Sequence, residues 1–76
     1  MTYVIRIGRK KDGRIEWYYY NGNTYKKDGQ CFVEELFVTL DKAKRYSTKD
    51  AAEKAGDKLH DKCSNVNLWF VEEINE

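Results

Sequence analysis

Hydrophobic and polar residues alternate along the first part of the chain, as they do in β-strands whose two faces differ. The alternation predicts three strands, over Tyr3–Arg9, Arg14–Tyr20 and about Cys31 to Thr39. Asn23–Lys27 is ambiguous between a short strand and a loop, and a loop is slightly favoured. Dipeptides that favour tight turns separate the strands: Asp12-Gly13, Asn21-Gly22 and Asp28-Gly29. We therefore expect a β-meander.

The spacing of the apolar residues changes from two to about 3.6 in the second half of the chain, which is typical of an amphipathic helix. Thr48 to Cys63 carries an apolar stripe formed by Ala52, Ala55, Leu59 and Cys63. Thr48 suits the N-cap of this helix. Val66–Ile74 follows as a final strand.

The resulting order, β-β-β-α-β, predicts an α+β fold with an antiparallel sheet of about four strands and one helix packed on one face. The 76 residues suffice for a single domain, residues 1–76, with a modest core. Aromatic residues make up 14% of the chain, which is too much for a disordered polymer.

Residues 17–20 read Trp-Tyr-Tyr-Tyr, and a strand directs successive side chains to opposite faces. Ile15 shares a face with Trp17 and Tyr19, whereas Glu16 shares the other face with Tyr18 and Tyr20. We expect the first set to lie under the helix together with Tyr3, Ile5 and Ile7. In the last strand the alternation favours Val66, Leu68 and Phe70 as core residues, with Trp69 and Val71 facing away.

The sheet face without a helix is then expected to be apolar and aromatic. It collects Val4, Arg6, Glu16, Tyr18, Tyr20, Trp69 and Val71, with either Val33 and Phe37 or Phe32 and Leu36 from the third strand. Exposed Tyr and Trp are typical of protein interfaces, so Tyr18, Tyr20 and Trp69 are predicted partner-binding residues. The alternative is a structural surface on which the rings pack against Lys and Arg stems. A homodimer would use the same surface.

Charge is nearly balanced overall, at +1, but it is unevenly distributed. Residues 1–30 carry seven Lys and Arg against three Asp and Glu, and residues 31–76 carry seven against ten. This balance argues against general affinity for nucleic acid. A nucleic-acid interface would combine the aromatic face with Arg6 and Arg14, but the basic pairs of the hairpin tips lie too far apart to form one cradle.

The predicted helix carries its acidic residues on one outward strip. Glu53, Asp57 and Asp61 follow Asp50 at helical spacing, and Lys54, Lys58 and Lys62 form a neighbouring row. The acidic strip of Glu53, Asp57 and Asp61 is a second predicted partner-binding feature, because it resembles the charge of a phosphate backbone. An ordinary solvated helix face is the alternative.

The chain carries no motif for catalysis or for a cofactor, so we expect neither enzymatic activity nor a bound cofactor. His60 and Cys63 lie one helical turn apart, but two groups do not complete a metal site or a catalytic triad. Cys31 and Cys63 are expected to be free thiols, with a disulfide as the alternative in an oxidising compartment. No signal peptide or membrane-spanning stretch is recognisable, which predicts a soluble, cytosolic protein.

The second half of the chain resembles a pattern common in small phage and prophage proteins. The matching positions are Leu40, Ala43, Tyr46, Thr48, Ala52 and Ala55. Such proteins include anti-CRISPR and other anti-defence inhibitors. The resemblance implies a partner that is a host protein, including nucleic-acid-binding defence proteins, in the cytoplasm of the host cell.

These observations predict a non-enzymatic protein-binding module that inhibits or modulates a host protein by steric occlusion or by charge mimicry. Two alternatives remain open. One is a nucleic-acid-binding regulator that uses the aromatic and basic sheet face, and the other is a homodimeric structural protein.

Overall fold

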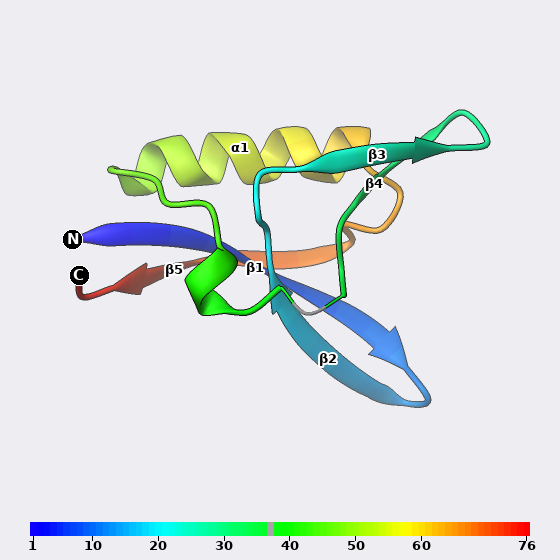
Figure 1. The fold of residues 1–76 in the computed structure, drawn as a ribbon, viewed down its shortest axis with the longest axis horizontal. Helices are drawn as coiled ribbons and strands as arrows, with labels where there is room; N and C mark the ends of the chain where they lie inside the picture. Colours follow the sequence, from blue (N-terminus) through cyan, green and yellow to red (C-terminus); the bar gives the residue numbers. More distant parts are fainter. Residues whose placement is uncertain (37) are drawn as a thin grey trace.

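The computed structural model, which describes residues 1–36 and 38–76, has an α+β fold as predicted (Figure 1). Its long helix lies against strands that come from both ends of the chain. The elements are β1 (Thr2–Lys11), β2 (Arg14–Tyr19), β3 (Thr24–Lys27), β4 (Gln30–Val33), the 3-10 helix η1 (Leu40–Lys42), α1 (Lys49–Lys62) and β5 (Leu68–Ile74).

The strands form two antiparallel units rather than one sheet of about four strands. The main sheet has the order β2-β1-β5, and β3 pairs with β4 in a separate hairpin. The expectation of a loop over Asn23–Lys27 is therefore wrong, because β3 pairs with β4 across the turn at Asp28-Gly29. The third predicted strand ends at Val33 instead of Thr39, where the pairing with β3 ends. Phe37 lies outside the described residues.

Two of the predicted turns connect paired strands. At Asp12-Gly13 the φ angles are 51° and 77°, and at Asp28-Gly29 they are 53° and 78°. These left-handed conformations suit Asp-Gly in two-residue hairpin turns and match the right-handed twist of the strands. Gly22 also has positive φ, at 93°, but Asn21-Gly22 leads from the main sheet to the β3–β4 hairpin and does not close a hairpin.

The predicted helix is confirmed, together with its N-cap. The Thr48 hydroxyl accepts a hydrogen bond from the Ala51 N–H at 3.1 Å, which satisfies one of the free donors of the first turn. Ala52 and Leu59 are buried on the side that faces the sheet. Small residues on this stripe allow the helix to approach the strands closely.

The main core lies between α1 and the main sheet. Ile5 and Ile7 of β1 are fully buried in it, as predicted. Its other buried members are Tyr18, Tyr20, Cys31, Val33, Ala52, Leu59, Cys63 and Val66. Cys31 and Val33 bring the β3–β4 hairpin into this core, so the hairpin packs on the domain although it belongs to a separate sheet.

The predicted orientation of β2 is wrong. Ile7 lies opposite Tyr18, and the Tyr20 N–H donates to the Ile5 carbonyl at 3.0 Å, so Tyr18 and Tyr20 face the helix. Their side chains are buried, whereas Ile15 and Trp17 are exposed. The exposed Glu16 does not indicate which face of β2 is buried. The tip of the β1–β2 hairpin extends past the helix (Figure 1), and neither face of β2 is covered there.

The predicted orientation of β5 is also wrong. Trp69 pairs with Ile7 and Val71 pairs with Ile5, so both lie on the helix side of the sheet and pack against the core. Leu68 and Phe70 face the other way and are exposed. The reason lies in α1, where Gly56 leaves room for the indole ring of Trp69 directly against the helix backbone.

The face of the sheet opposite α1, called here the outer face, is covered over only part of its length. Val4 points to this face by alternation from Ile5 and is fully buried, and Val38 and Ala43 are buried as well. Residues 38–46 pass over this end of the sheet and return to its edge, where Tyr46 exchanges backbone hydrogen bonds of 3.0 and 2.9 Å with Tyr3 of β1. The outer face is therefore closed near Val4 and open toward Gly8.

Candidate interaction surface

Four large apolar side chains lie exposed on the open part of the outer face. Their exposed fractions are 45% for Ile15, 39% for Trp17, 39% for Leu68 and 41% for Phe70. We call this group the outer-face patch. Trp17 and Phe70 meet edge to face with ring centroids 5.2 Å apart, across the width of β1. An exposed aromatic surface was expected from the sequence, but the structure forms it from the opposite set of residues.

Gly8 lies at the centre of the outer-face patch. It pairs with Trp17 of β2 and with Leu68 of β5. A Cβ atom at this position would lie 2.9 Å from Leu68 Cδ2, 3.0 Å from Ile15 Cγ2 and 3.1 Å from Trp17 Cζ3. The missing side chain thus lets residues of β2 and β5 converge across β1 into one continuous apolar surface.

Arg6 lies next to Gly8 on the same face and supports the aromatic rings. Its guanidinium carbon lies 5.6 Å from the ring centroids of Trp17 and Tyr19 and 5.9 Å from that of Phe70. The same guanidinium forms an ion pair of 3.2 Å with Glu72. The positive charge of Arg6 therefore faces three aromatic rings and is paired with one carboxylate.

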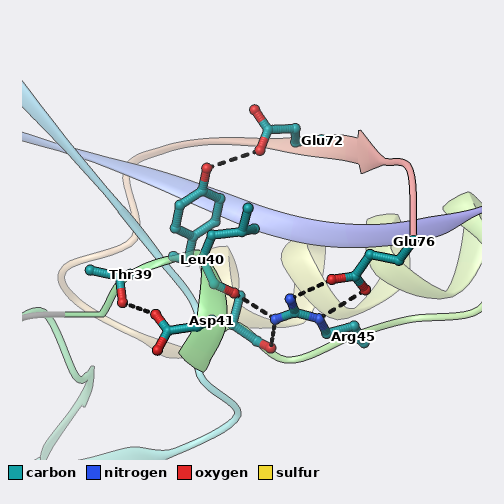
Figure 2. A network of polar contacts seen from close by, with 8 residues as sticks. Thr39, Leu40, Asp41, Arg45, Glu72 and Glu76 are labelled. Carbon is teal, nitrogen blue, oxygen red and sulfur yellow. Dashed lines mark hydrogen bonds and ion pairs between the residues drawn. The ribbon is translucent and has the colours of Figure 1, made fainter.

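Glu72 also accepts a hydrogen bond of 3.0 Å from the Tyr19 hydroxyl (Figure 2). Burial and this contact raise the pKa of Tyr19 above its usual value. The contact marks the border of the open face, because residues 38–46 begin to cover the sheet here.

Arg45 fixes this covering segment (Figure 2). Its guanidinium donates to the carbonyls of Leu40 and Ala43 and forms an ion pair of 2.7 Å with Glu76. The hydrogen bond to Arg45 lowers the pKa of Glu76. Thr39 and Asp41 are hydrogen-bonded at the start of η1. The covering segment is thereby tied to the C-terminal end of the described chain.

Arg9, which follows Gly8 in β1 and therefore points to the helix side of the sheet, is also paired. It lies 2.7 Å from a Glu16 oxygen and 3.7 Å from a Glu35 oxygen. Its hydrogen bond lowers the pKa of Glu16. Since Arg6, the guanidinium that faces the rings, has a carboxylate partner, its position favours apolar contact over binding of phosphate groups.

The predicted aromatic site residues lie elsewhere. Tyr18 and Tyr20 are core residues, and burial raises the pKa of both hydroxyls. Trp69 lies under α1, where it lines a groove of about 350 Å³ with Lys49, Glu53, Asp57, Phe70 and Val71. Arg6 is the member of the predicted outer face that the structure brings to the outer-face patch.

The predicted acidic strip lies on the exposed side of α1. Glu53, Asp57 and Asp61 are all exposed. Lys49 lies 3.8 Å from Glu53, and Lys54 lies 3.1 Å from Asp50. The helix and the outer-face patch lie on opposite sides of the sheet, although Glu53 and Asp57 also line the groove at the β5 edge with Phe70.

His60 and Cys63, which lie one helical turn apart, both have contacts within the described part of the chain. His60 Nδ1 lies 2.9 Å from the Val66 carbonyl oxygen, a contact that ties the end of α1 to the following loop. Within residues 1–36 and 38–76, no three His, Cys, Asp or Glu side chains are grouped so that they hold a metal ion. No helix in this part of the chain is both long and apolar enough to cross a membrane.

Comparisons of the chain with protein-family models, with curated proteins and with solved structures gave no match. The outer-face patch therefore rests on its own geometry. One sequence signal indicates its location: Gly8 interrupts an otherwise β-favouring segment, and a glycine inside a strand often marks a close approach of neighbouring groups.

Proposed function

We propose that the protein is a non-enzymatic protein-binding module that binds its partner through the outer-face patch. The observation that carries the proposal is the convergence of Ile15, Trp17 and Leu68 over Gly8, with Phe70 against Trp17. Each of the four side chains has about two fifths of its surface exposed. Wet faces of antiparallel sheets are normally polar. A contiguous apolar group on such a face is typical of an interaction site.

The composition of the patch favours a protein partner. Aromatic residues and Arg are enriched at the centres of protein interfaces, where they carry much of the binding energy. The rings here are held in place by Arg6, which reduces the side-chain entropy lost on binding. The ion pair of Arg6 with Glu72, next to the rings, argues against nucleic acid as the ligand.

The partner is proposed to be a host protein, and the mechanism is steric occlusion. The first part of this proposal rests on the resemblance of residues 40–55 to small phage and prophage proteins. The mechanism of steric occlusion rests on the location of the patch, because the tip of the β1–β2 hairpin lies beside a partner that is bound there. Charge mimicry by Glu53, Asp57 and Asp61 would require a second partner surface on the opposite side of the domain.

The test compares partner capture by the wild-type protein and by two variants. Trp17→Thr combined with Phe70→Thr removes both rings of the patch while keeping residues that suit a strand. Tyr25→Thr is the matched control, because Tyr25 is also an exposed aromatic residue of a strand and stacks on Phe32 with centroids 5.5 Å apart. Each immobilised protein is exposed to nuclease-treated lysate of a candidate host.

The proposal predicts a protein retained by the wild-type chain and by Tyr25→Thr but lost from the patch variant. Retention that hardly changes between low and high salt agrees with an apolar interface, whereas retention of nucleic acid that falls steeply with salt supports the nucleic-acid alternative. Equal retention by all three proteins would exclude the patch as the site. Sedimentation at several concentrations identifies a homodimer, which would replace the host protein as the partner.

A further inference from the structure

Two cysteine thiols meet where the β3–β4 hairpin touches the C-terminal end of α1. Cys31 lies in β4, and Cys63 is the C-cap residue of α1. Their Sγ atoms are 3.2 Å apart, and both side chains are buried. Both cysteines are free thiols in this structure.

The backbone holds these two residues side by side. Cys31 and Cys63 form an isolated β-bridge, and the Ser64 N–H donates to the Cys31 carbonyl at 2.8 Å. Neighbouring strands lie about 5 Å apart, which is within the Cα separations that disulfides span. The backbone therefore already has the spacing that a covalent bond between the two sulfur atoms requires.

The same junction attaches the hairpin to the rest of the domain. Within the described part of the chain, β3 and β4 pair with each other and not with the main sheet. The Asn65 side chain binds the backbone of Val33 twice, through bonds of 2.9 and 3.0 Å. The turn of the hairpin projects away from the body of the molecule (Figure 1). A bond at this junction would thus control how firmly the hairpin is held.

We propose that Cys31 and Cys63 form an oxidation-sensitive thiol pair, which a small-molecule disulfide such as glutathione disulfide converts into a disulfide bond that fastens the β3–β4 hairpin to α1. This inference is independent of the outer-face patch and its partner.

The reaction is a double thiol–disulfide exchange. One cysteine thiolate attacks a sulfur of glutathione disulfide, which forms a mixed disulfide and releases one glutathione thiolate. The second cysteine thiolate attacks the protein sulfur of the mixed disulfide and releases the second glutathione. The protein gives up two electrons, and the two thiol protons end on the two glutathione molecules.

The environment of the thiols makes this oxidation slow. Burial and the neighbouring Cys31 raise the pKa of Cys63 to about 11, so the reactive thiolate is scarce at neutral pH. The small-molecule disulfide also has to reach two buried sulfur atoms. We therefore expect the exchange to proceed when the hairpin opens locally, and the closed disulfide to resist reduction for the same reason.

The experiment incubates the folded, full-length wild-type protein with oxidised glutathione and follows its intact mass without reduction. The expected product has lost two hydrogen atoms, and its digest contains a peptide that links Cys31 to Cys63. The melting temperature should rise by about 10 °C and return after dithiothreitol treatment. Trypsin cleavage after the exposed Lys26 and Lys27 should slow severalfold in the oxidised form.

Cys31→Ala and Cys63→Ala, each made alone, are the controls, and each should form a mixed disulfide or none and keep its trypsin sensitivity. Should either variant fail to fold, the linked peptide of the wild-type protein remains a sufficient test. The proposal is overturned if the wild-type protein stays a dithiol, stops at the glutathione adduct or forms only intermolecular disulfides. If the linked peptide forms but trypsin cleaves the hairpin as fast as before, the disulfide does not fasten the hairpin and that part of the proposal is overturned.

Discussion

Gly56 of α1 and Trp69 of β5 are in direct contact, with the indole ring lying where a side chain at position 56 would be. A Cβ atom on Gly56 would approach the ring atoms Cε3 and Cη2 to 2.6 Å. Such a distance is far shorter than a normal van der Waals contact. The glycine therefore sets the distance between the helix and the edge of the sheet.

Gly56→Ala should destabilise the protein although alanine is the better helix former. The gain in helix propensity is about 1 kcal/mol, whereas overpacking against a large ring costs about 1–3 kcal/mol. We expect a net loss of up to about 2 kcal/mol in the free energy of unfolding, measured by urea denaturation. A double-mutant cycle with Trp69→Leu should remove most of this cost. A net gain of stability in Gly56→Ala alone would disprove the contact.

The orientation of β2 predicts different costs for two neighbouring substitutions. Tyr18 lies in the core and Trp17 on the outer face. Tyr18→Gln buries an amide in an apolar environment, and it should cost about 2 kcal/mol more than Trp17→Gln. Urea denaturation of both variants measures the difference. A larger loss of stability in Trp17→Gln than in Tyr18→Gln would contradict this orientation and support the one predicted from Glu16, with Trp17 in the core.

Much of this fold is predictable from the sequence. Thr48 places the start of α1, and Asp12-Gly13 and Asp28-Gly29 place two hairpins, because capping and positive φ depend on local chemistry. Local chemistry does not determine which face of β2 is buried. Four consecutive aromatic residues provide no polar contrast, and the exposed Glu16 lies beyond the end of the core.

The candidate site was less predictable for the same reason. The sequence indicates that one aromatic pair of β2 is exposed, but the choice of pair depends on where α1 lies, and this is a tertiary property. Gly56 and Gly8 are the two signals that were available. One marks the place where Trp69 packs under the helix, and the other marks the centre of the outer-face patch.

Gly8→Ala should separate binding from stability. The added methyl group would meet the flexible ends of Leu68 and Ile15 and the ring edge of Trp17, all of them side-chain atoms. These side chains can shift, and the lower backbone entropy of alanine offsets part of the cost, so stability should change by about 1 kcal/mol or less. Affinity for a partner of the outer-face patch should fall about tenfold, since its apolar surface is reshaped. Unchanged affinity, measured by calorimetry, would argue that the partner does not contact this surface.

The buried tyrosines predict a loss of stability in alkaline solution. Burial raises the pKa of Tyr46 to about 12 and also raises the pKa of Tyr20 and Tyr18. Because the folded state favours the neutral phenol, this stabilisation is complete below the unfolded pKa of about 10 and is lost as pH rises through the folded values. In the folded protein, the phenolate absorbance of these tyrosines should therefore increase only well above about pH 10. The full increase should appear when the protein unfolds. A single step for all tyrosines near pH 10 in the folded state would contradict their burial.

We propose that the partner binds the outer-face patch and not the acidic strip of α1. Amide hydrogen exchange of the protein, measured alone and saturated with the partner that it captures, distinguishes the two surfaces. Binding at the patch should slow exchange in β2 and β5, around Trp17 and Phe70, and leave α1 unchanged. Slower exchange confined to Lys49–Lys62, with β2 and β5 unaffected, would contradict it.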